Sequence, residues 1–251
     1  MNWWRLYFEI CDFLVGLVPN RAWREKIRRE ELYDYRKKFN ALRAALPCNE
    51  FKNIRIIKGG WNIGFIIDNK YVCKIRKFCN KDVPADKIIR EKRITDAFAP
   101  IVPVRIPRIE IVKSQGYIFY KYGFIPGKNL NRMPLRIIEK NGWKWGKQLA
   151  EFIDAMHNAD PVELADLKTS DGDGWNHHDI CNNIIVDTKT MNIVGLIDWE
   201  YSGWGPLETE FRNCTAFSKK MRDSGIGTAI QLEYHVMQKR KKSDIKKHKS
   251  A

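Results

Sequence analysis

Residues 175–186 have the sequence WNHHDICNNIIV, and residues 195–200 have the sequence GLIDWE. In the first stretch, a loop rich in histidine, aspartate and asparagine leads into an apolar run typical of a buried strand. A turn and a second apolar run then lead to the aspartate of the second stretch. This order predicts a short hairpin with polar side chains gathered at one end, namely Asp179, Asn183 and Asp198.

An aspartate and an asparagine in one loop, with a second aspartate close by, are typical of a phosphoryl-transfer site. Such a reaction needs a carboxylate near the acceptor hydroxyl, which orients the hydroxyl and takes its proton. It also needs Mg²⁺ to neutralise the phosphates, and this metal prefers oxygen ligands from carboxylate and amide groups. Asp179 fits the first requirement, and Asn183 with Asp198 fits the second.

These stretches resemble the aminoglycoside phosphotransferase and choline kinase superfamily, whose members have a protein-kinase-like fold. Members carry H-x-D-x-x-x-x-N followed by an I-D-W/F-E motif, and residues 197–200 match the second motif. The resemblance covers about residues 54–212. It implies an ATP- and Mg²⁺-dependent phosphotransferase with Asp179 and His177 in the catalytic loop, where the histidine would brace the loop. Asn183 and Asp198 would hold the metal.

The resemblance also implies a nucleotide site in the strand-rich half of the chain. The glycines would cover the phosphates, the lysine would contact the α- and β-phosphates, and a helix glutamate would hold the lysine. Two tyrosines resemble the hinge where the adenine would lie. The implied nucleotide-binding residues are Gly59, Gly60, Lys74, Glu91, Tyr120 and Tyr122.

The catalytic loop departs from the superfamily pattern in length. The superfamily places the aspartate and the asparagine five residues apart, whereas Asp179 and Asn183 are four apart. His178 also stands where a glycine or asparagine is common. Because a misplacement of about 1 Å can lower a rate by about 100-fold, two functions stay open. One is an active phosphotransferase, and the other is a pseudokinase-like binding or scaffolding module with little or no phosphotransfer.

Outward from this loop, the sequence predicts an α+β protein with two lobes. Short β-rich runs and one helix, residues 85–98, predict a small antiparallel-sheet lobe over residues 49–127. Amphipathic patterns predict a helical lobe over residues 128–238. Residues 1–48 are expected to form an N-terminal helical extension, and the basic segment 239–251 a disordered tail. We expect the ligand site in a cleft between the lobes.

Individual elements follow from the same patterns. The expected strands are residues 54–57, 64–67, 71–75, 109–112, 117–120, 184–186 and 193–197, with a hairpin turn at 68–70. The other clear helices are residues 22–46 and 143–158. Apolar side chains at helical spacing are expected in the core, and in the second of these helices they are Trp145, Leu149, Phe152, Ile153 and Met156.

The N-terminal 18 residues, MNWWRLYFEICDFLVGLV, are apolar apart from three charges, Arg5, Glu9 and Asp12. These charges argue against a signal peptide and against a membrane span. Their spacing places them on one stripe of a helix. This helix either packs against protein or lies in a membrane interface, with its aromatic side chains inserted. Basic residues follow it, which suits peripheral contact with an anionic membrane; they are Arg21, Arg24, Lys26, Arg28 and Arg29.

Composition sets the remaining limits. The chain has 251 residues and 44% hydrophobic residues, enough for a real core. Its formal charge of +15 attracts anionic partners, but charge alone does not favour nucleic acid. Six cysteines without a CxxC pair indicate reduced thiols in the cytoplasm. We expect a cytoplasmic protein, with peripheral contact at the inner face of the membrane as the alternative.

The acceptor is the least determined feature. Few acids follow the catalytic loop (Glu200, Glu208 and Glu210), which disfavours a polycationic aminoglycoside. Glu210 itself resembles the superfamily's structural acidic residue in the next helix. The basic surface better suits the hydroxyl of a small molecule or a cell-envelope sugar, such as one of lipopolysaccharide, and a choline-like acceptor stays open. The oligomeric state is not determined by the sequence.

Overall fold

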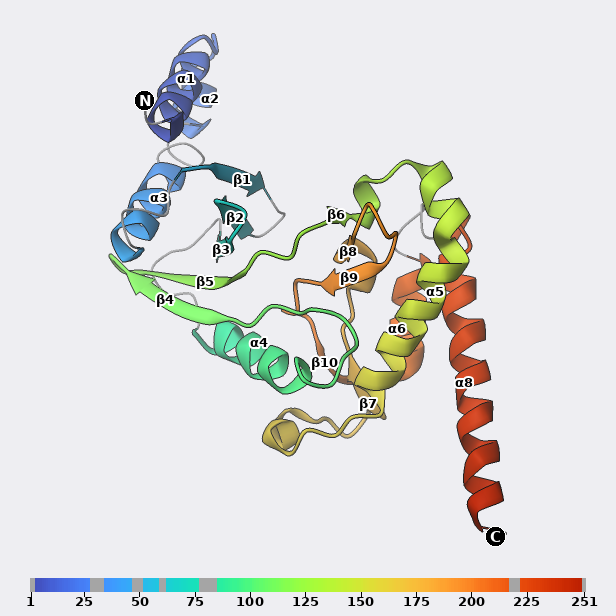
Figure 1. The fold of residues 1–251 in the computed structure, drawn as a ribbon. Helices are drawn as coiled ribbons and strands as arrows, with labels where there is room; N and C mark the ends of the chain where they lie inside the picture. The colour runs from blue at the N-terminus through green and yellow to red at the C-terminus, as the bar shows by residue number, and fades with distance from the viewer. Residues whose placement is uncertain are drawn as a thin grey trace. The chain divides into compact units, whose positions relative to one another are not determined.

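The computed structural model describes residues 3–27, 34–46, 52–58, 62–76, 85–216 and 222–249. The chain divides into two compact units, which are described separately (Figure 1). The sheet unit comprises Met1–Ala85 with Glu110–Phe124, and the helical unit comprises Asp86–Ile109 with Ile125–Ala251. Mixed helix and sheet confirm the expected α+β class.

The elements follow one another in nearly the expected order. The sheet unit contains α1 (Trp3–Gly16), α2 (Arg21–Ile27), α3 (Asp34–Ala45), β1 (Ile54–Lys58), β2 (Asn62–Ile67), β3 (Tyr71–Arg76), β4 (Glu110–Ser114) and β5 (Tyr117–Gly123). The helical unit contains α4 (Ala85–Phe98), β6 (Lys128–Asn129), α5 (Leu135–His157), β7 (Gly174–Asn176), β8 (Ile184–Val186), β9 (Ile193–Leu196), β10 (Gly203–Gly205), α6 (Leu207–Ala216) and α8 (Ile226–Lys249). It also contains three 3₁₀ helices, η3 (Leu130–Arg132), η4 (Val162–Leu167) and η5 (Ile180–Asn182).

The sheet unit is built on a five-stranded antiparallel sheet with the strand order β1-β2-β3-β5-β4. The β2–β3 connection is the predicted hairpin turn. Asp68 and Asn69 both have positive φ, 52° and 53°, and Lys70 N donates to Ile67 O at 2.8 Å. Two consecutive residues with positive φ match the right-handed twist of the flanking strands, so the turn is confirmed.

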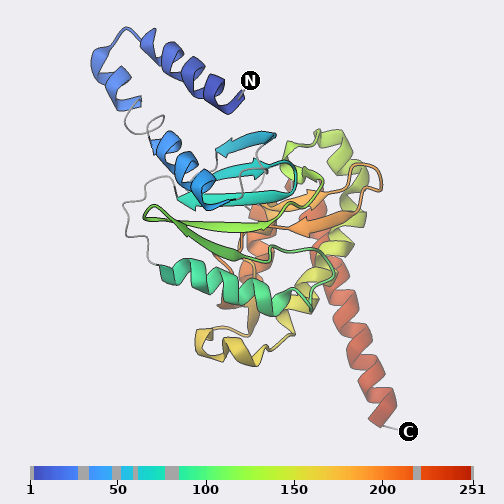
Figure 2. The same ribbon diagram turned by 60° about the vertical axis from the view of Figure 1, so that its left-hand side comes forward.

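Helix α3 covers one face of this sheet (Figure 2). Phe39 is 1% exposed and its ring centroid lies 5.7 Å from that of Phe65. The predicted apolar face of the helix is buried with it, and its described members are Tyr35, Phe39, Leu42 and Leu46. The prediction that residues 1–48 form a separate extension is therefore wrong for α3, which is part of the core of the sheet unit. Residues 28–33, inside the predicted 22–46 helix, lie outside the described residues.

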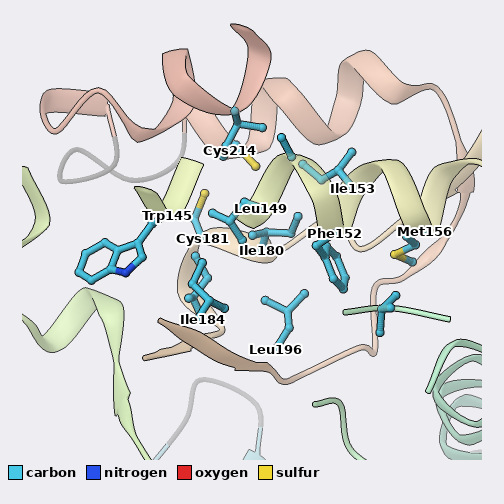
Figure 3. Packing of buried hydrophobic residues seen from close by; sticks show 14 of the residues in the cluster. Trp145, Leu149, Phe152, Ile153, Met156, Ile180, Cys181, Ile184, Leu196 and Cys214 are labelled. Carbon is cyan, nitrogen blue, oxygen red and sulfur yellow. The ribbon is translucent and has the colours of Figure 1, made fainter. Parts of the chain in front are cut away.

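The core of the helical unit centres on α5 (Figure 3). The predicted apolar stripe of this helix is buried, as expected. The helix begins at Leu135, eight residues earlier than predicted, and it contains Gly142 and Gly146. A Cβ at Gly142 would lie 2.8 Å from Ser224 O, and one at Gly146 would lie 2.4 Å from Ala229 Cβ. These glycines therefore allow close approach of the chain at and before α8 and do not break the helix.

Two predicted boundaries differ from the structure. Residues 86–109 group with the helical unit, because Phe98 of α4 packs against Trp175 and Trp199 with ring centroids 5.8 and 6.1 Å away. The predicted disordered tail begins at residue 239, whereas α8 continues as helix to Lys249. The buried carboxylate of Asp154 accounts for part of this extension, since Lys241 Nζ lies 2.6 Å from its Oδ2.

Four of the six cysteines lie among the described residues. Cys11, Cys73, Cys181 and Cys214 are free cysteines, and Cys48 and Cys79 lie outside the described residues. Over the described part of the chain, no helix combines the length and the apolar character needed to cross a membrane.

Replacing Phe39 with alanine should strongly destabilise the sheet unit. The substitution leaves a cavity between α3 and the sheet, and a buried Phe→Ala change costs about 3–5 kcal/mol. Urea unfolding of the full chain measures this loss as a fall in the free energy of unfolding. Arg36→Ala, at an exposed position of the same helix, is the matched control and should change it by less than about 0.5 kcal/mol. Equal effects of the two substitutions would show that α3 does not belong to the core.

Candidate active site

The loop between β7 and β8 carries the residues predicted to be catalytic. β7 pairs with β10, which places His177 at the end of a short two-stranded sheet. His178 has a φ of 65°, in the left-handed region that few residues other than glycine adopt. The chain then forms the single 3₁₀ turn η5, which is closed by a hydrogen bond from Asn183 N to Ile180 O at 3.0 Å. The turn ends at the start of β8.

This turn brings Asn183 back to Asp179. The side-chain amide Nδ2 of Asn183 donates to the backbone O of Asp179 and to its carboxylate Oδ2, both at 2.8 Å. A 3₁₀ helix has three residues per turn, fewer than an α-helix, so it closes over a shorter stretch of chain. The missing residue between the aspartate and the asparagine is therefore absorbed by the turn, and both side chains lie in the same site.

The second predicted metal ligand lies on the neighbouring strand. Ile197 N donates to Asn183 O at 3.1 Å, which extends the β8–β9 hairpin by one step beyond its last paired residues. Asp198 follows directly and has a φ of 67°. Asn183 and the residue before Asp198 are thus hydrogen-bonded neighbours across the hairpin. The backbone therefore brings both positions to one end of the hairpin, whereas their role as metal ligands stays a prediction.

Asp179 lies in a negative environment. Its half-burial raises the pKa of the carboxyl, the side-chain N–H groups of Asn182 and Asn183 lower it, and the nearby charges of Asp198 and Glu200 raise it again. The net shift is upward. The charges of Asp198 and Glu200 therefore lie close enough to act on the carboxyl of Asp179.

His177 is fully buried and contacts the backbone on both sides of its ring. Its Nδ1 accepts from Asp179 N at 3.2 Å, and its Nε2 lies 3.2 Å from Ile197 O. Because Ile197 O can only accept, Nε2 carries the proton and the ring is neutral. The ring also packs edge-on against Trp199, with centroids 5.0 Å apart. These contacts fit the bracing role expected of His177, and the side chain joins the loop to the strand before Asp198.

Glu210 of α6 binds the backbone of the same loop. Its carboxylate Oε2 accepts from the backbone N–H groups of His177 and His178 at 2.5 and 2.9 Å. The residue is 1% exposed, and burial raises its pKa to about 7 despite these two hydrogen bonds. The sequence marked Glu210 as a structural acid but did not place it among the site residues. Only the fold shows that its side chain reaches the catalytic loop.

Glu91 of α4 contacts the loop that carries Asp198. Its Oε1 accepts from Trp199 N at 3.2 Å. The preceding residue, Arg90, donates to Ser202 O at 2.5 Å, so α4 supports both ends of this turn. Lys74, the predicted partner of Glu91, belongs to the sheet unit. Their pairing therefore stays a prediction.

The other predicted nucleotide-binding residues of the sheet unit share one face of the sheet. Lys74 is the register partner of Tyr120, and Val72 is that of Tyr122, so alternate residues of β3 and β5 lie on the same side. This face is opposite the one that α3 covers, and Lys74 Nζ lies 6.0 Å from the centroid of the Tyr120 ring. Both tyrosines are buried, which leaves little of either ring for stacking on an adenine. Gly59 and Gly60 lie outside the described residues.

A pocket of about 210 Å³ opens beside Asp179 in the helical unit. It is lined by His178, Asp179, Cys181, Asn182, Tyr201 and Asn213. Burial, and then the charge of Arg90, lower the pKa of His178, so its ring is neutral at pH 7. Among the described residues that line this pocket, Asp179 is therefore the one charged group. Such a lining suits an uncharged polar ligand.

The donor set also fits Mg²⁺. Among the described residues, no group of three or more histidine, cysteine, aspartate or glutamate side chains is arranged to hold a metal. Mg²⁺ in nucleotide sites needs fewer protein ligands, because phosphates and water complete its shell. The amide of Asn183 and the carboxylate of Asp198 supply the oxygen ligands that this ion prefers, next to the carboxylates described above.

Among the solved structures with this fold are aminoglycoside and macrolide phosphotransferases. The GDP complex of wild-type aminoglycoside 2′-phosphotransferase-IIIa matches with a TM-score of 0.65 and 11% identity over 79% of this chain and 82% of that one. The streptomycin–ATP–APH(2″)-IIa ternary complex matches with a TM-score of 0.56 and 15% identity over 79% and 81%. Macrolide 2′-phosphotransferase type I matches with a TM-score of 0.56 and 11% identity over 80% and 81%. The chain therefore has their protein-kinase-like α+β fold.

Sequence comparison adds nothing to this structural likeness. No protein-family model and no curated protein sequence matches the chain.

The buried Glu210 should make the stability of the protein depend on pH. Because burial raises its folded pKa to about 7, the folded state holds a proton that the unfolded state releases above about pH 4.5. Stability contributed by this group is thus complete below that pH and is lost as the pH rises to about 7. Glu210→Gln cannot titrate and retains an acceptor for both N–H groups.

The matching measurement is the free energy of unfolding of both proteins between pH 5 and pH 8. The wild type should lose on the order of 2–4 kcal/mol relative to Glu210→Gln over this range. A difference that stays constant with pH would mean that Glu210 is ionised throughout.

Proposed function

We propose that this chain is an ATP- and Mg²⁺-dependent phosphotransferase that phosphorylates a hydroxyl group, in the manner of the aminoglycoside phosphotransferase and choline kinase superfamily. The observation that carries the proposal is the contact between Asn183 and Asp179, next to Asp198. It supports a competent catalytic loop in spite of the missing residue. The alternative of a pseudokinase was based on the shortened loop. The experiment below must exclude that alternative.

In this proposal Asp179 receives the proton of the acceptor hydroxyl. The O–H bond breaks, a bond forms between the oxygen and the γ-phosphorus of ATP, and the bond from that phosphorus to the ADP oxygen breaks. The released proton moves to a carboxylate oxygen of Asp179. Burial and the charges of Asp198 and Glu200 raise the pKa of this carboxyl, and a higher pKa makes it a stronger base.

Asn183 and Asp198 would hold Mg²⁺, which neutralises charge on the phosphates when it is bound. Glu91 helps to position Asp198, because it accepts a hydrogen bond from the backbone N of the next residue, Trp199. His177 and Glu210 support the position of Asp179, since they accept hydrogen bonds from its own backbone N–H and from those of the two residues before it. The chain's own contribution is thus to hold two carboxylates and an amide at fixed positions.

Lys74, Tyr120 and Tyr122 would form the nucleotide side of the site, with Gly59 and Gly60 over the phosphates. Support comes from the shared sheet face of the lysine and the two tyrosines. Further support comes from the solved structures with this fold, which hold GDP, ADP or ATP. Because both tyrosine rings are buried, we infer that the adenine is held by backbone groups of this strand more than by stacking.

The acceptor that best fits the pocket is a neutral sugar hydroxyl. Of the lining residues that the structure describes, Asp179 alone is charged, and the ring of Tyr201 is exposed beside it. A polycationic aminoglycoside would need several carboxylates, and a choline-like cation would need an aromatic or acidic cage. A sugar of the cell envelope, such as one of lipopolysaccharide, meets the requirement for a neutral polar acceptor.

Transfer of label from γ-labelled ATP to a panel of acceptors tests this function. The panel contains neutral sugars, a cell-envelope extract, choline and an aminoglycoside. We expect Mg²⁺-dependent labelling of a neutral sugar or an envelope fraction, and no labelling of the aminoglycoside. Asp179→Asn should reduce the rate by at least about 100-fold, because the proton acceptor is lost.

Asp171→Asn, the same change at an exposed loop position of the helical unit, should leave the rate unchanged. If neither an acceptor nor water takes the phosphate, the chain is a pseudokinase and the proposal fails. Labelling of the aminoglycoside alone would contradict the assigned acceptor class.

A further inference from the structure

An apolar stripe runs along the N-terminal helix and is left uncovered. Ile10, Phe13 and Leu14 recur at the spacing i, i+3, i+4, which places them on one face of α1, and Leu17 follows in the turn directly after the helix, where its N donates to Leu14 O at 3.2 Å. These four side chains are between 48% and 69% exposed. An apolar face of this width is normally buried. The apolar face of α3, by comparison, is buried against the sheet.

The chain after α1 adds an aromatic and a basic group. Trp23 of α2 is 66% exposed, and Asn20 Oδ1 accepts from its backbone N at 3.1 Å, which caps the start of α2. Arg24 of α2 donates from NH1 to Val18 O at 3.2 Å, which ties α2 to the end of α1. Arg21, at the first position of α2, is exposed. The segment 3–27 therefore presents apolar, aromatic and cationic side chains together.

We propose that the α1–α2 segment, residues 3–27, docks into the interface of an anionic lipid bilayer. The stripe of Ile10, Phe13, Leu14 and Leu17 enters the boundary between headgroups and acyl chains, and the indole of Trp23 lies at headgroup level. Arg21 contacts lipid phosphates. No helix of the described chain can cross a bilayer, so the attachment is peripheral.

Charge favours lipid over a second copy of the chain as the occupant. The chain carries a formal charge of +15, and residues 3–27 contain four basic and three acidic residues. Two copies joined through this segment would bring like charges together, whereas an anionic surface attracts each basic side chain by about 1 kcal/mol.

Docking does not depend on the proposed phosphotransfer, although it would bring the chain to an envelope acceptor. Membrane binding can therefore be measured without nucleotide. A failure to bind vesicles is thus distinguishable from a failure to transfer phosphate.

Co-sedimentation of the full chain with sucrose-loaded vesicles tests the proposal. One set of vesicles is phosphatidylcholine alone, and the other contains about one third phosphatidylglycerol. We expect strong binding to the anionic vesicles, weaker binding to the neutral ones, and loss of the difference in high salt. The double variant Phe13→Glu/Leu17→Glu should lower the partition coefficient at least about tenfold, since two apolar side chains no longer insert.

The matched control is Val162→Glu/Leu232→Glu, which makes the same change at two exposed apolar residues of the helical unit, 84% and 51% exposed. It should bind as the wild type does, and circular dichroism should show that both variants fold. Unchanged binding of the Phe13→Glu/Leu17→Glu protein would overturn the proposal in favour of the general basic surface. Absence of vesicle binding by the wild type would also overturn it. So would a wild-type dimer in size-exclusion chromatography that this variant alone dissociates, because the stripe would then be a contact between copies.

Discussion

The candidate site depends on one hydrogen-bonded contact, that of the Asn183 amide with the backbone and carboxylate of Asp179. The loop between these residues is one residue shorter than the superfamily pattern, and the contact nevertheless forms. A 3₁₀ turn with its own closing hydrogen bond shortens that path. Because Asn183 is also joined to the strand before Asp198, the same residue fixes the distance between the two carboxylates on which the proposed chemistry relies.

Buried glutamates on two helices hold this arrangement from outside the loop. Glu210 accepts two backbone N–H groups ahead of Asp179, and Glu91 accepts the one that follows Asp198. Each connects a helix to the backbone of the site, so the positions of the candidate catalytic groups are set by the helical core. A buried carboxylate that lost such partners would be costly. The fold therefore ties the stability of the helical unit to the geometry of the site.

Much of this could be predicted from the sequence, because local patterns determined it. Helix α4 and strand β8 have the expected boundaries, and the Asp68–Asn69 turn follows from residues that tolerate positive φ. The features that the sequence did not predict depend on contacts between residues that are distant in sequence. By sequence alone Gly142 suggests a helix break, whereas in the structure it allows close approach of the chain just before α8. The basic composition of the tail suggests disorder, whereas Lys241 in it forms an ion pair with Asp154. Likewise, the sequence could identify Asp179 and Asn183 but not the turn that unites them, nor the reach of Glu210 into their loop.

The central claim is that Asn183, and not its neighbour Asn182, occupies the metal-binding position of the shortened loop. Asn182 also bonds to Asp179, from Nδ2 to Oδ1 at 2.9 Å, but it is exposed. The increase in melting temperature caused by ATP, measured with and without Mg²⁺ in Asn183→Ala and Asn182→Ala, separates the two directly. The account predicts that Asn183→Ala loses the Mg²⁺-dependent part of the increase and that Asn182→Ala keeps it. The reverse result, or an increase that depends on neither residue, would contradict it.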